Sequence, residues 1–170
     1  EVIKYGVIGD LFLFSFLEKN RKKVLSRNPA TLSFLVEQSA RAKAWVVGRD
    51  EKESGLRMTL NFGHTLGHAI EKQTGYGSWR HGEAVAQGMR LAARISLRQK
   101  QCFLPAVVRL ETLLKDYGLL KKKVKTARGR LIQAVLLDKK GFKGKVRFVF
   151  MRGIGKVLVK AVPPRQLQWV

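Results

Sequence analysis

Acidic residues, cysteine and long apolar runs are all scarce in this chain of 170 residues. The single cysteine, Cys102, excludes an intramolecular disulfide and any metal site built from thiolates alone. Uncharged, mainly apolar runs such as Leu11 to Leu17 are far shorter than the roughly 20 residues that cross a bilayer. The sequence therefore predicts a protein without a membrane span, and we expect it in the cytoplasm.

A dinucleotide-binding signature is also missing. No G-x-G-x-x-G motif is present, and strand and helix patterns do not alternate along the chain. Hydrophobic residues nevertheless make up 45% of the sequence, which is enough to build a folded core. We therefore expect one folded domain that contains no parallel nucleotide-binding sheet.

Positive charge is abundant and unevenly distributed. The chain has 34 basic residues and only 12 acidic ones, which gives a net charge of +22. Residues 1–85 carry 13 basic and 9 acidic residues, whereas residues 86–170 carry 21 and 3. Such asymmetry is compatible with an anionic partner, such as nucleic acid or a phosphate, and equally with a solvated basic surface.

Hydrophobic periodicity predicts a mainly α-helical domain with a small C-terminal β-hairpin. Asp10 is expected to cap the first helix and Pro29 to begin the second. The expected helices cover residues 11–20, 29–44, 83–98, 105–117 and 128–137, and the expected strands cover 146–150 and 156–159.

The three histidines, His64, His68 and His81, all lie within 18 residues. If residues 57–68 form one helix, Arg57, Asn61, His64 and His68 fall within an arc of roughly 60° on one face. The intervening residues are apolar or small, so this polar face is expected to be buried and to need partners. A hydrogen-bonded core network would satisfy it, but the convergence of so many functional groups favours a binding site.

Two glycines precede the first two histidines. Glycine inside a helix costs about 1 kcal/mol relative to alanine. Gly63 and Gly67 therefore indicate the close approach either of another backbone or of a ligand. The spacing from His64 to His68 resembles that of zinc proteases, but the glutamate of their H-E-x-x-H motif is missing, which argues against that class.

Several motifs together resemble the 3-dehydroquinate synthase family, within the sugar-phosphate cyclase superfamily. Residues 61–71 read NFGHTLGHAIE and residues 75–86 read GYGSWRHGEAVA, followed by GM at 88–89. EVIKYG at 1–6 resembles the metal-ligand segment of the family, and RAKAWVV at 41–47, DE at 50–51 and GLR at 55–57 fit the stretch between. The tail is similar through DKK at 138–140, GKVRFV at 144–149 and IG at 154–155.

The resemblance implies a two-domain enzyme with an N-terminal NAD-binding α/β domain and a mainly helical C-terminal domain. Residues 1–170 are expected to be the C-terminal metal- and substrate-binding domain, with the NAD-binding domain absent from this chain. The isolated chain is accordingly expected to be inactive, and the intact protein is expected to form a homodimer.

Site residues follow from the resemblance position by position. Glu1, His64 and His81 would bind a divalent metal, Zn²⁺ or Co²⁺, which suits two imidazoles and a carboxylate. The remaining matches are expected to line the substrate pocket: Lys4, Lys43, Arg57, Asn61, His68 and Lys139, with Lys140 as the alternative to Lys139. Their cations suit a substrate that carries both a phosphate and a carboxylate.

The implied reaction belongs to the shikimate pathway of aromatic amino-acid biosynthesis. It converts 3-deoxy-arabino-heptulosonate 7-phosphate to 3-dehydroquinate and phosphate by oxidation with NAD, phosphate elimination, reduction and aldol closure. A different sugar-phosphate cyclase would share the metal trio, and a basic nucleic-acid-binding module is a less favoured alternative.

Some of these residues also have simpler explanations. Lys4 lies one turn from Glu1, so the two could form a plain surface ion pair. Lys43 could simply be solvated, and Cys102 is expected to be a packing residue. Glu71 and Glu83, close to the histidines in sequence, are expected to be structural or to support the metal ligands.

Overall fold

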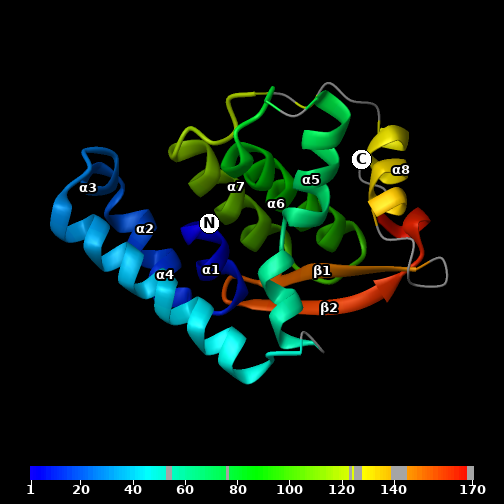
Figure 1. The fold of residues 1–170 in the computed structure, drawn as a ribbon. Helices are drawn as coiled ribbons and strands as arrows, with labels where there is room; N and C mark the ends of the chain where they lie inside the picture. The colour runs from blue at the N-terminus through cyan, green and yellow to red at the C-terminus, as the bar shows by residue number, and fades with distance from the viewer. Residues whose placement is uncertain (53–54, 76, 123, 125–127, 139–144, 168–170) are drawn as a thin grey trace.

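The computed structural model describes residues 1–52, 55–75, 77–122, 124, 128–138 and 145–167 (Figure 1). Helices make up most of the molecule and a two-stranded hairpin follows them, as the sequence predicts. No helix among the described residues is long and apolar enough to cross a membrane. The expected contact residues Lys139 and Lys140 lie outside the described residues.

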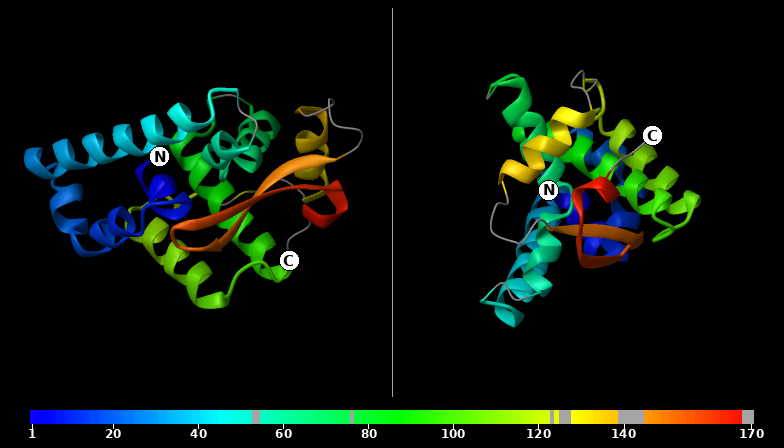
Figure 2. Two further views of the ribbon diagram at one scale, coloured as in Figure 1. Left: turned by 90° about the horizontal axis from the view of Figure 1, so that it is seen from below. Right: turned by 90° about the vertical axis from the view of Figure 1, so that its right-hand side faces the viewer.

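Four helices form the N-terminal part: α1 (Val2–Ile8), α2 (Leu11–Lys19), α3 (Arg21–Leu25) and α4 (Pro29–Arg49). Asp10 caps α2 by accepting a hydrogen bond from the Leu13 backbone N–H at 2.8 Å, as expected. The long helix α4 forms one edge of the molecule in both further views (Figure 2). It packs against α1, which follows Glu1 directly and contains Lys4.

The segment that carries Arg57 and the first two histidines is not one helix, contrary to the expectation. A 3₁₀ helix, η1 (Leu56–Asn61), is followed by Phe62, whose backbone is extended (φ −57°, ψ 121°). Gly63 then adopts the left-handed conformation (φ +81°) and α5 begins at His64 (His64–Thr74). Arg57 and Asn61 therefore do not share a continuous helical face with the histidines, because the chain turns between them.

Helices α5 and α6 (His81–Arg98) cross in close contact, and three glycines lie at the crossing. A Cβ on Gly88 would lie 2.0 Å from the Gly63 carbonyl oxygen, and a Cβ on Gly67 would lie 3.1 Å from the Val85 Cα. The glycines thus reflect the approach of another backbone, one of the two explanations that the sequence left open. Alanine at these positions would push the two helices apart.

The remaining elements enclose the crossing. Helix α7 (Leu104–Asp116) packs on α6, and α8 (Arg128–Asp138) packs on α5. Strands β1 (Val146–Gly153) and β2 (Lys156–Val162) pair antiparallel, with Val146 opposite Val162. A short 3₁₀ helix, η2 (Pro164–Leu167), ends the described chain.

Strand β1 is buried because α6 covers it. The Ser96 hydroxyl of α6 accepts a hydrogen bond from the Met151 backbone N–H at 2.9 Å, which joins helix to strand. The core that these elements share is large and apolar, and its largest fully buried side chains include Phe14, Phe62, Ile70, Met89, Leu110, Phe148 and Phe150.

Candidate metal centre

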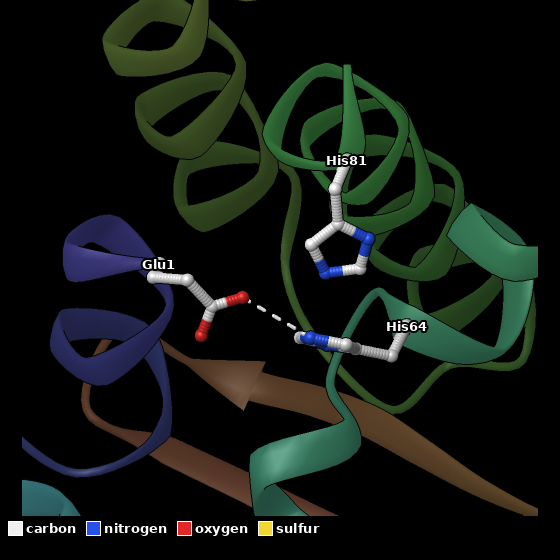
Figure 3. A group of neighbouring side chains, drawn as sticks. All are labelled: Glu1, His64 and His81. Atoms are coloured by element: carbon white, nitrogen blue, oxygen red, sulfur yellow. Dashed lines mark ion pairs between the residues drawn. The ribbon is translucent and has the colours of Figure 1, made fainter. Parts of the chain in front are cut away.

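Three elements bring Glu1, His64 and His81 together (Figure 3). Glu1 precedes α1, His64 is the first residue of α5 and His81 is the first residue of α6. One ligand atom from each of the three lies within 4.8 Å of those of the other two. We call these residues the metal trio.

One edge of the metal trio already has the spacing of a zinc site. Glu1 Oε1 lies 3.1 Å from His64 Nε2. Two ligand atoms at zinc–ligand distances near 2.0–2.1 Å and a tetrahedral angle are about 3.3 Å apart. Two imidazoles and a carboxylate are also an established zinc ligand set that leaves a coordination position open. The residues present therefore fit a catalytic Zn²⁺ or a similar divalent ion.

Glu1 is held in its ionised form. The hydrogen bond from His64 lowers the pKa of the Glu1 carboxyl well below its usual range, opposed by partial burial and reinforced by Lys4. The ammonium of Lys4 lies 2.5 Å from Glu1 Oε2, on the side away from His64. Lys4 is only 4% exposed, so the pair is not the surface ion pair considered above.

The imidazole nitrogens are arranged for ligation through Nε2. The Nδ1 atom of His64 lies 3.3 Å from the Phe62 carbonyl oxygen, an acceptor that can hold a proton on Nδ1 when Nε2 binds a metal. Without a metal, Nε2 faces Glu1 and donates the hydrogen bond that lowers the Glu1 pKa, and a bound ion would take the place of that proton. The turn at Phe62 and Gly63, which the sequence analysis missed, thus supplies the group that orients His64.

His68, which the sequence predicts to line the substrate pocket, lies beside the metal trio. Its ring centroid is 5.8 Å from those of both His64 and His81, and the residue is exposed. Because His68 follows His64 by one turn of α5, the two imidazoles share a helix face. The structure therefore brings all three histidines of the chain into one cluster.

The other predicted pocket residues are less closely gathered. Lys43 is exposed on α4, and Asn61 is half-buried at the end of η1. The Arg57 guanidinium donates a hydrogen bond to the Glu51 carbonyl oxygen at 3.2 Å, and its backbone N–H donates to Asp50. Within the described residues, no ion pair joins Lys43 or Arg57 to the metal trio.

A cavity of about 400 Å³ lies between α1, α4 and η1. Tyr5, one of its lining residues, is close in sequence to Glu1, but no residue of the metal trio lines the cavity. Its walls are partly aromatic and partly polar and include Tyr5, Arg41, Trp45, Leu56 and Thr59. None of the predicted ligands or pocket residues that the structure describes lines it.

The side chain of Lys122 contacts Ser78 and Trp79, in the loop before His81, and Glu83 of α6. Its ammonium donates to the Ser78 carbonyl oxygen at 2.9 Å, lies 3.4 Å from Glu83 Oε2 and is 5.6 Å from the centre of the Trp79 ring. The Gln87 side-chain amide of α6 donates to the Lys122 carbonyl oxygen at 2.6 Å. Residues 121–125 read KKKVK, and Lys122 of this basic stretch thus makes intramolecular contacts.

Comparisons with known proteins place this chain in a family. Residues 1–141 match the family described as 3-dehydroquinate synthase C-terminal. A curated 3-dehydroquinate synthase from Pelobacter propionicus is 47% identical over 98% of this chain, and one from Nitrosomonas europaea is 43% identical over 92%. The chain spans 46% and 42% of those two proteins, which is less than half of their length.

Two solved structures share the fold. One is 2-epi-5-epi-valiolone synthase from Streptomyces hygroscopicus with NAD⁺ and Zn²⁺ bound (TM-score 0.85, 19% identity, 98% of this chain and 47% of that one). The other is 2-deoxy-scyllo-inosose synthase with carbaglucose-6-phosphate, NAD⁺ and Co²⁺ (TM-score 0.84, 24% identity, 98% and 47%). By its sequence match and its fold, this chain belongs to the 3-dehydroquinate synthase family and corresponds to its C-terminal part.

Proposed function

We propose that this chain is the metal- and substrate-binding half of a 3-dehydroquinate synthase. The observation that supports this most is the convergence of Glu1, His64 and His81 from three separate elements, in a chain 47% identical to a protein of that name. The substrate would be 3-deoxy-arabino-heptulosonate 7-phosphate. A second, NAD-binding domain would complete the enzyme, which would act in the cytoplasm as a homodimer.

The metal trio would hold Zn²⁺ or Co²⁺, the ions named for the two solved neighbours. Such an ion supplies Lewis-acid chemistry, which lowers the pKa of a bound hydroxyl. Glu1 would arrive as a carboxylate because His64 and Lys4 keep its pKa low. Lys4 would fix the orientation of that carboxylate from the side away from His64.

The substrate would be bound mainly through charge. Lys43, Arg57 and Lys139 would recognise its phosphate and carboxylate, with the guanidinium able to bind such a group through two parallel hydrogen bonds. Arg57 would have to leave its contact with the Glu51 carbonyl to do so. Asn61 would bind a hydroxyl, and the exposed imidazole of His68 would hold or move a proton beside the metal trio.

Metal content gives the first test. The purified chain, dialysed against trace zinc, should contain about one ion by mass spectrometry. His64→Ala should lose it, whereas His68→Ala, which removes the neighbouring imidazole outside the metal trio, should keep it. A chain that binds no zinc, or a His64→Ala variant that binds as much as the wild type, would refute the site.

The choice among cyclases needs a substrate test. Identity to the curated 3-dehydroquinate synthases is 43–47%, against 19–24% to the two solved cyclases, and this difference favours the first reaction. The chain should be inactive alone with NAD and zinc and should turn over the heptulosonate phosphate when joined to the NAD-binding half of a relative. Preference of that joined protein for a sugar phosphate without a carboxylate, such as glucose 6-phosphate, would refute the assignment.

A further inference from the structure

Glu71 faces the metal trio from the same helix as two of the histidines. It follows His64 by seven residues and His68 by three, which places all three side chains on one face of α5. Its side chain is only 15% exposed. Its carboxylate oxygens lie 3.3 Å and 3.4 Å from the Nδ1 atom of His81 on the neighbouring helix.

This contact decides which nitrogen of His81 is available. A carboxylate only accepts hydrogen bonds, so it favours the tautomer in which Nδ1 carries the proton. The opposite ring nitrogen, Nε2, then keeps its lone pair, and in Figure 3 it points toward His64 and Glu1. Glu71 therefore has the same relation to His81 that the Phe62 carbonyl has to His64.

We propose that Glu71 is a positioning residue of the metal centre, which holds His81 as the Nδ1–H tautomer and aims its Nε2 at the ion. The proposal rests on the function proposed above in placing the ion at the metal trio. It assigns a carboxylate–histidine–metal arrangement, in which the outer carboxylate fixes the ring and makes it a more basic ligand. Loss of such an outer partner typically weakens metal binding 10- to 100-fold.

Glu71 could instead be a ligand itself. Ligand atoms of His68, Glu71 and His81 also lie within 4.8 Å of one another, so this second group could take an ion. The two groups share His81, however. An imidazole that binds one ion through Nε2 can bind a second through Nδ1 only by losing its last ring proton, and the direct Glu71–Nδ1 contact uses that proton instead.

Zinc titration of four forms of the chain tests the role of Glu71. The forms are the wild type, Glu71→Ala, Glu71→Gln and Gln73→Ala, the last a control on the same helix at an exposed position. We expect one ion per chain throughout, with affinity reduced 10- to 100-fold in Glu71→Ala. Glu71→Gln should recover part of the loss because its amide oxygen still accepts from Nδ1–H, and Gln73→Ala should match the wild type. Circular dichroism confirms that each form is folded.

Imidazole nitrogen NMR of the metal-free chain gives a readout that does not depend on binding. The wild type should show neutral His81 mainly as the Nδ1–H tautomer, and Glu71→Ala should shift it toward Nε2–H, the form that prevails for free imidazole side chains. Unchanged affinity or an unchanged tautomer in Glu71→Ala would overturn the proposal. So would two ions per wild-type chain with one lost in Glu71→Ala, since Glu71 would then be a ligand. A wild type that shows the expected tautomer but binds no zinc would refute the proposed function and leave the Glu71–His81 contact standing.

Discussion

Replacing Gly88 with alanine should separate the two helices that carry the histidines. The added Cβ would lie 2.0 Å from the Gly63 carbonyl oxygen and 2.7 Å from the Gly67 backbone nitrogen. Backbone atoms cannot move aside as the end of a side chain can, so α5 and α6 must shift. The expected result is a less stable chain whose His81 no longer faces His64.

The size of the effect follows from two opposing contributions. Overpacking a core typically costs 1–3 kcal/mol, and contact with rigid backbone places this case at about 3 kcal/mol or more. Alanine gains up to about 1 kcal/mol over glycine in a helix. We expect the free energy of unfolding to fall by about 2 kcal/mol or more, a large part of the roughly 5–15 kcal/mol of a typical domain.

Urea denaturation followed by circular dichroism measures this loss, with Gly48→Ala as the matched control. Gly48 is also helical, but a Cβ there would meet nothing within 4 Å, so the control should be neutral or slightly more stable than the wild type. Zinc affinity should fall in Gly88→Ala and stay unchanged in the control. A Gly88→Ala chain as stable as the wild type would refute the reasoning about the crossing.

Three further outcomes are expected. Burial raises the pKa of the Cys102 thiol to about 11. A thiol reagent at pH 8 should therefore modify Cys102 very slowly in the native chain and rapidly in the urea-unfolded chain. Rapid labelling of the native chain would contradict this. Burial raises the pKa of the Glu111 carboxyl, but Arg94 and Arg90 outweigh it and the net shift is downward. The stabilisation by Glu111, about 1 kcal/mol or less, should therefore be present above its unfolded pKa near 4.3 and be lost as the pH falls through the lower folded value. Glu111→Gln should flatten the stability profile below pH 5, and an identical profile would refute the pairing. Lys122→Ala removes the contacts with Ser78 and Glu83, so it should increase amide hydrogen exchange at residues 77–80 and weaken zinc binding. Lys156→Ala, a control at an exposed position on β2, should change neither.

Local patterns in the sequence predicted most of the longer helices and the hairpin, but not α1 or α3. Asp10 begins α2 because its carboxylate satisfies a free backbone N–H of the first turn, a contact made within four residues. His64 and His68 share a face of α5 because side chains four residues apart are neighbours on any helix. Helix α6 begins at His81, two residues before the expected start. The prediction missed these two residues because they show no apolar periodicity.

The break between η1 and α5 was not visible in the pattern. Residues 57–68 have helical spacing, but the extended backbone of Phe62 and the left-handed backbone of Gly63 interrupt it. The reason lies outside the segment, since a side chain on Gly63 would meet Met89 and the Val85 carbonyl of α6. A contact between helices, absent from any local window of sequence, therefore decided where α5 begins.

The sequence by itself determined which residues could bind a metal, because few side chains are suited to that chemistry and this chain has only three histidines. Only the tertiary structure decided that Glu1, 63 residues before His64, lies 3.1 Å from it, and that Glu71 faces His81 across two helices. Packing of α1, α5 and α6 sets these distances. The candidate ligands thus follow from side-chain chemistry together with the family resemblance, whereas their geometry depends on contacts between residues far apart in the chain.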